Sequence, residues 1–170
     1  MATRSEDEKD TPAARLQAFM ERFDPGHRKF IGSVRTAVRK RLPTANELVY
    51  DYRTFIVIAY SPTDKPMEAI VSLAARPEGV SLYFNNSPRL PDPKKLLQGS
   101  GKQARYIGIE SASRLKHPDV EALIAGAIKL AGVPLPATGR GQLIIRTDSE
   151  KKRPRGKPAK SILKVARDRS

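Results

Sequence analysis

Apolar residues recur at helical spacing in three segments of the chain, residues 12–23, 25–41 and 118–131. In each segment they return every three or four positions, which places them on one face of an amphipathic helix. Asp24 stands before a proline and is the expected N-cap of the second helix. Pro43 is expected to end that helix, because the residue before a proline is pushed out of the α region.

Between the second and third helices the pattern changes to short runs rich in β-branched and aromatic residues, which are typical of strands. The runs cover residues 47–52, 54–60, 67–75, 80–85 and 104–110. Short connections between the first four predict an antiparallel meander, with Gly79 in the last hairpin free to adopt a positive φ. We expect a short helix over 93–97 within the longer crossover 86–103, and a weak further strand over 142–147.

Together these elements predict an α+β fold, with an antiparallel β-sheet of about five strands packed by two N-terminal helices and one C-terminal helix. The predicted domain covers residues 12–147. Residues 1–11 are charged and lack periodicity, which predicts a disordered N-terminus. Residues 148–170 are rich in basic residues, proline and glycine, and we expect a disordered basic tail there.

The chain is strongly basic, with 32 Lys and Arg against 18 Asp and Glu and a formal net charge of +14. It has no Cys, which excludes disulfides, iron–sulfur clusters and thiolate zinc sites. No apolar run approaches the roughly 20 residues that span a bilayer, and the polar N-terminus lacks the apolar core of a signal peptide. We therefore expect a soluble, cytoplasmic protein with no membrane partner.

The most distinctive motif lies between the fourth and fifth predicted strands. It reads Leu82-Tyr83-Phe84, Leu90-Pro91-Asp92-Pro93, Leu96-Leu97-Gln98-Gly99-Ser100-Gly101-Lys102 and Arg105-Tyr106-Ile107. This motif resembles the YdhG-like family, bacterial domains of unknown function, and the resemblance covers about residues 14–132. It implies an antiparallel sheet packed by helices, similar to frataxin-like and YjbR-like domains. Some relatives are described as iron chaperones, so iron handling is an alternative function.

An iron site needs several oxygen or imidazole ligands gathered together. The predicted second helix carries six basic residues and no carboxylate; they are Arg28, Lys29, Arg35, Arg39, Lys40 and Arg41. A cationic surface repels a metal ion before it binds. The sequence therefore supports the family's fold more than its iron chemistry, and we predict no metal ligands and no cofactor.

Basic and aromatic residues come together at two predicted strand ends. Tyr52, Arg53 and Phe55 belong to the first hairpin, and Lys102 and Arg105 precede or begin the fifth strand. If these strand ends lie on one side of the sheet, their side chains line a cleft for an anion, where tyrosine supplies stacking and arginine a two-pronged donor. The alternative is aromatic core packing surrounded by solvated charges.

Gly99, Ser100, Gly101 and Lys102 form a possible phosphate-binding turn. Two glycines allow successive N–H groups to converge on an anion, and Lys102 adds charge. The spacing is not that of a P-loop, because a strand rather than a helix is expected to follow. The alternative is a simple turn, with Gly99 as the C-cap of the short helix.

No catalytic constellation is evident. His27 and His117 lack the partners of a catalytic triad, and the acidic residues Glu47, Asp51, Asp92 and Glu110 are scattered. We therefore predict no catalytic residues and a non-catalytic binding module for an anionic ligand or partner.

The basic tail provides another alternative function, weak nucleic-acid binding through counterion release. The cations concerned are Lys151, Lys152, Arg153, Arg155, Lys157 and Lys160. The same composition is also typical of a tail that only improves solubility.

Overall fold

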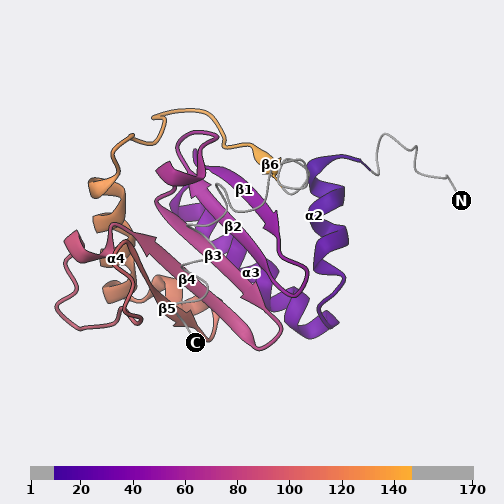
Figure 1. Ribbon diagram of the computed structural model, residues 1–170, viewed down its shortest axis with the longest axis horizontal. Helices are drawn as coiled ribbons and strands as arrows, with labels where there is room; N and C mark the ends of the chain where they lie inside the picture. The colour runs from indigo at the N-terminus through magenta and orange to yellow at the C-terminus, as the bar shows by residue number, and fades with distance from the viewer. Residues whose placement is uncertain (1–9, 147–170) are drawn as a thin grey trace, which may run out of the picture.

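The structure is a computed structural model that describes residues 10–146 (Figure 1). The helices are α2 (Pro12–Met20), α3 (Pro25–Arg41) and α4 (Pro118–Leu130), and the 3₁₀ turns are η1 (Pro66–Glu68), η2 (Ser87–Arg89) and η3 (Ala112–Lys116). The strands are β1 (Asn46–Asp51), β2 (Ile56–Ser61), β3 (Val71–Arg76), β4 (Gly79–Asn85), β5 (Ala104–Ile109) and β6 (Leu143–Ile145). The α+β class with two N-terminal helices and one C-terminal helix is confirmed.

The strands form one sheet in the order β5-β4-β3-β2-β1-β6. The antiparallel meander predicted for the first four strands is confirmed, and β5 continues it by pairing antiparallel with β4 after the crossover. The weak strand predicted over 142–147 is present as β6, which pairs in parallel with β1. After α4 the chain crosses one end of the sheet and reaches the β1 edge, where β6 pairs (Figure 1). The predictions for residues 1–9 and 148–170 lie outside the described residues.

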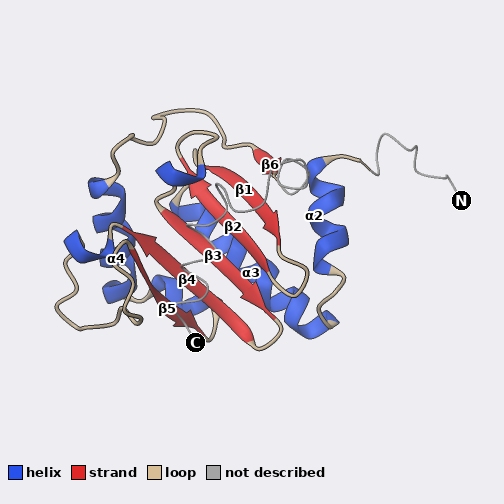
Figure 2. Ribbon diagram, in the orientation of Figure 1, coloured by secondary structure: helices blue, strands red, loops and turns tan. Residues whose placement is uncertain are grey.

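The helices lie on one face of the sheet. Figure 2 shows α3 and α4 behind the strands and α2 beside the β6 edge. Buried side chains of α3 and α4 pack against the strand residues that point toward them. Their buried members are Ile31, Val34, Val38, Val120, Leu123, Ile124 and Ala127. Among the helices of residues 10–146, none combines the length and apolar character needed to span a bilayer.

The helix starts follow the local sequence. The Asp24 carboxylate accepts a hydrogen bond from the N–H of His27 at 3.0 Å, so the predicted N-cap of α3 is confirmed. At the start of α4, His117 Nδ1 accepts a hydrogen bond from the N–H of Asp119 at 3.2 Å. Both histidines therefore occupy structural positions at helix starts.

Two local predictions are wrong. Residues 93–97 form no helix, because the Asp92 carboxylate accepts the N–H groups of Leu96 and Leu97, both at 2.9 Å, and Lys95 has a φ of 54°. The Asp92 side chain therefore accepts the hydrogen bonds that backbone carbonyl oxygens would accept in a helix. Gly79 does not have a positive φ, since it is the first residue of β4 and pairs with Arg76 in an ordinary ladder.

Candidate functional site

The sheet separates the residues of the predicted anion cleft. Arg53 lies in the β1–β2 hairpin, at the end of the sheet where β3 finishes at Arg76. Arg105 pairs with Phe84 near the opposite end, and Lys102 precedes it. Strands β2, β3 and β4 also stand between β1 and β5. The five residues therefore do not line one cleft, and the condition on which that site depended is not met.

Arg53 has a structural role through its backbone. Its φ is 68°, its N–H donates to Asp51 Oδ1 at 3.0 Å, and its carbonyl oxygen accepts a hydrogen bond from Arg22. Arg22 also pairs with the Asp51 carboxylate at 2.6 Å. These contacts hold Arg53 in the left-handed conformation that the hairpin turn requires, so the structure assigns its backbone a role in the turn.

Aromatic side chains gather on the sheet face that points away from α3 and α4. We call this surface the aromatic face; it comprises Tyr50, Tyr52, Phe55, Tyr83 and Tyr106. The rings of Tyr52 and Phe55 stack at 5.0 Å, and those of the cross-strand partners Tyr83 and Tyr106 lie 5.1 Å apart. The Arg76 guanidinium lies 4.8 Å from the centre of the Phe55 ring. The expected aromatic packing is thus present, but on the face opposite the helix-covered core.

Lys102 and Arg105 belong to a second feature, the basic loop, which we define as residues 86–105. It holds five cations, Arg89, Lys94, Lys95, Lys102 and Arg105, and one carboxylate, Asp92. The first four cations are exposed and Arg105 is half-buried. Because both oxygens of Asp92 accept backbone hydrogen bonds within the loop, the only acid of the loop is already engaged.

The predicted phosphate turn lies in this loop. The backbones of Gln98 and Tyr106 exchange hydrogen bonds of 2.7 and 3.1 Å, which fasten the loop to the outer edge of β5. Gly99 then turns the chain with a φ of 97°. Within residues 10–146, no backbone N–H of residues 99–102 donates a hydrogen bond. No helix precedes Gly99, so its interpretation as a helix C-cap is wrong.

Arg105 folds back over the turn. Its Nε donates to the Gly101 carbonyl oxygen at 3.3 Å, and its own N–H donates to Ser87 Oγ at 2.6 Å. The guanidinium is therefore held beside Gly101, one residue from Lys102. The turn brings into one short segment two cations and four N–H groups that donate to nothing within residues 10–146, and such groups are suitable for binding an anion.

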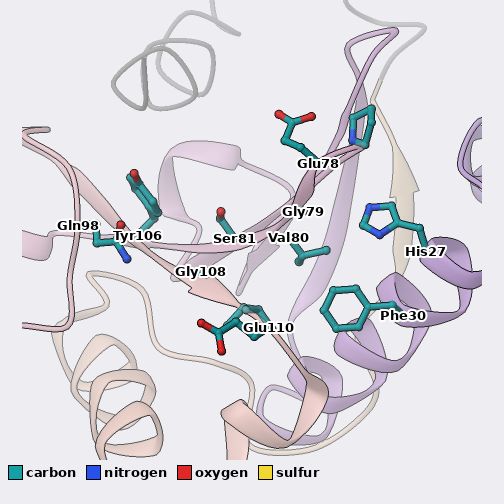
Figure 3. A pocket seen from close by; sticks show the side chains of 12 residues that line it. His27, Phe30, Glu78, Gly79, Val80, Ser81, Gln98, Tyr106, Gly108 and Glu110 are labelled. Carbon is teal, nitrogen blue, oxygen red and sulfur yellow. The ribbon is translucent and has the colours of Figure 1, made fainter.

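A cavity of about 470 Å³ lies between the start of α3, the β3–β4 hairpin and β5 (Figure 3). Its ionisable side chains include His27, Glu78 and Glu110, and the two carboxylates lie on opposite sides of it. His27 Nε2 donates to the Arg76 carbonyl oxygen at 2.6 Å. With neutral histidine, these three groups carry a charge of −2, so the cavity disfavours an anion. No pattern in the sequence indicates this cavity, because the residues that line it come from segments far apart in the chain.

One ionisable cluster is buried between α3 and the sheet. The Glu47 carboxylate accepts two hydrogen bonds from Arg35, both 2.8 Å, and one from the Tyr60 hydroxyl at 3.0 Å. Arg39 Nε lies 3.4 Å from the same carboxylate. Burial, reinforced by the Glu47 charge, raises the pKa of Tyr60 well above its ordinary value, and the hydrogen bond to Glu47 raises that of Arg35. None of these residues lines the cavity, and their contacts join α3 to β1 and β2.

The remaining predicted residues are placed as follows. The tail cations from Lys151 to Lys160 lie outside the described residues. Within residues 10–146, no three His, Asp or Glu side chains gather in a way that could hold a metal ion.

These features define an α+β domain with a basic loop between β4 and β5. Comparisons of the chain with protein-family models, with curated proteins and with solved structures give no match. The resemblance to the YdhG-like family therefore stays a prediction from the sequence motif.

Proposed function

We propose that the protein is a non-catalytic binding module for an anionic ligand and that the basic loop is its binding surface. The observation that carries the proposal is the loop's charge arrangement. Five cations share the loop with one carboxylate, and that carboxylate is occupied by the N–H groups of Leu96 and Leu97. The positive charge of the loop is thus left for a group from outside.

In this proposal the ligand is a small anion that carries a phosphate or carboxylate group. Lys102 supplies a point charge, Arg105 a guanidinium, and the backbone of residues 99–102 supplies N–H donors. No bond of the ligand is broken. The neighbouring cavity does not hold the anionic group, since Glu78 and Glu110 repel it there.

The YdhG-like resemblance belongs to the same proposal. Its motif begins in β4 and ends in β5, and it spans the whole basic loop between them. The most distinctive part of the resemblance therefore coincides with the loop that we propose as the binding surface.

A calorimetric titration with inorganic pyrophosphate at low ionic strength tests the proposal. Charge-assisted hydrogen bonds contribute about 1.5–3 kcal/mol each, so Lys102→Ala is expected to weaken binding by about tenfold or more. The matched control is Lys129→Ala, which removes one exposed cation from α4 and is expected to leave the affinity unchanged.

Two results would contradict the proposal. In the first, the Lys102 variant binds pyrophosphate as tightly as the unmodified protein. In the second, the Lys129 control weakens binding equally, which would assign the effect to net charge alone. Binding that survives in the Lys102 variant but disappears when the tail cations are replaced would favour the polyanion alternative.

A further inference from the structure

Two tyrosines of the aromatic face are buried, although no described helix covers this face, and Tyr52, Phe55 and Tyr106 are half-buried. Tyr50 is 4 % exposed and Tyr83 is 3 % exposed. Apart from Ala69, the residues of the cluster lie on strands or in the β1–β2 connection. The α-helices of residues 10–146 lie behind the sheet or beside its β6 edge (Figure 2). Tyrosines on a bare sheet face would be exposed to water, so this face requires a covering segment.

The chain itself leaves the described domain at this face. Ile144 of β6 packs against the aromatic cluster, and the N–H of Arg146 donates to the Val49 carbonyl oxygen at 2.9 Å. The next 24 residues, 147–170, follow directly from that position. Strands lie about 4.8 Å apart, so a six-stranded sheet is about 24 Å wide. An extended chain covers about 3.3 Å per residue, so this segment can cross the whole face.

The composition of residues 147–170 suits such a surface. Ile162, Leu163 and Val165 supply apolar side chains, and basic residues stand among and after them at Lys164, Arg167 and Arg169. Apolar side chains pack against aromatic rings, and cations bind over the face of a ring. We propose that residues 147–170 dock on the aromatic face of their own chain, and that Ile162 and Leu163 anchor the docking.

Site-specific spin labelling of the full chain tests this proposal. The protein has no Cys, so Ser161→Cys provides a unique position for a nitroxide. Docking is expected to broaden the ring signals of Tyr83 and Tyr106 in the NMR spectrum until they lose most of their intensity. The methyl signals of Ile124, which lies in α4 behind the sheet, are expected to keep theirs. A label at Lys129→Cys on α4 is expected to give the reverse pattern.

Replacement of the anchors provides a second measurement. Ile162→Asp with Leu163→Asp, in the Ser161-labelled chain, is expected to restore the tyrosine signals. The matched control is Ser149→Asp with Ser170→Asp, which makes the same change in charge and is expected to leave the broadening in place. These positions lie outside the described residues 10–146, so the variants change none of the core side chains named above.

Three results would overturn the proposal. The first is that the Ser161 label leaves the tyrosine signals unaffected. The second is that the control pair of substitutions restores these signals as fully as the anchor pair does. The third is broadening in a mixed sample where label and isotope are on different molecules, because the occupant would then come from a second copy.

Discussion

Replacement of Glu47 by glutamine is expected to reduce the free energy of unfolding substantially. Glu47 is 3 % exposed. Its carboxylate binds Arg35 through two hydrogen bonds of 2.8 Å and accepts one of 3.0 Å from Tyr60. Glutamine has nearly the same size and can still accept from Tyr60. Its amide group, however, turns N–H donors toward a guanidinium that is itself only a donor.

The magnitude follows from how well the remaining charges reach water. Removal of one partner from a fully buried ion pair costs about 3–5 kcal/mol. The side chain of Arg35 is 26 % exposed and that of Arg39 is 43 % exposed, so solvent compensates part of this loss. We therefore expect Glu47→Gln to lower the free energy of unfolding by about 2–3 kcal/mol.

Urea denaturation of the full chain measures this loss. The matched control is Glu121→Gln, whose carboxylate is 41 % exposed and lies 3.9 Å from Arg41. An exposed pair of this kind contributes about 0–1 kcal/mol, so the control is expected to resemble the unmodified protein. If Glu47→Gln loses no more than Glu121→Gln, the buried cluster does not stabilise the packing of α3 on the sheet, and the reasoning fails.

Three further outcomes are expected. Burial raises the pKa of Tyr60. The stability that its protonated hydroxyl contributes is therefore complete below pH 10 and is lost as the pH rises from the unfolded-state pKa toward the folded-state pKa. In urea unfolding between pH 9 and 11, Tyr60→Phe should lose less free energy of unfolding with rising pH than the unmodified protein does. Gly141→Ala should destabilise by about 1–3 kcal/mol, because its Cβ would lie 1.7 Å from the Ala45 carbonyl oxygen, whereas Gly132→Ala meets nothing within 4 Å and should leave the thermal midpoint unchanged. Asp92→Ala should cost about 1 kcal/mol by the loss of its turn-capping bonds and accelerate amide exchange at residues 96 and 97; unchanged exchange would contradict this role.

Local sequence patterns predicted an element correctly where a single feature, such as a helix cap or an alternating strand, determines it. Proline and Asp24 fixed the start of α3, and alternation of apolar and polar residues identified β4, whose Val80, Leu82 and Phe84 face the helix-covered core. These features depend on neighbours in the sequence, because a cap or an alternating strand acts within a few residues. The described residues therefore agree with the predicted class and connections.

The turn after Asp92 shows where local patterns fail. Pro93, with Leu96 and Leu97 three and four residues later, resembles the first turn of a helix, but the Asp92 side chain accepts the N–H groups of Leu96 and Leu97. Short helices and side-chain-capped turns compete for the same donors, and a difference of about 1 kcal/mol decides between them. The sequence contains both possibilities and does not rank them.

The predicted cleft fails because of the strand order, since β2, β3 and β4 stand between β1 and β5. The predicted meander covered only the first four strands, and the long crossover after them left the position of the fifth strand in the sheet open. The aromatic residues favoured a shared cleft, since basic and aromatic side chains occur together at both strand ends. Residue type indicates what a side chain can bind, whereas only strand order decides which side chains meet.

The basic loop contains two groups of residues, those that build its turns and those that only contribute charge. Asp92, Gln98 and Gly99 build the turns, through capping, a backbone bridge and a positive φ. Lys94, Lys95 and Lys102 contribute no side-chain hydrogen bond or ion pair within residues 10–146, and all three are exposed. A loop selected only for its shape has no use for three mutually repelling cations, since like charges destabilise the compact state. Their presence beside a carboxylate that is hydrogen-bonded within the loop is the feature on which the proposed anionic ligand depends.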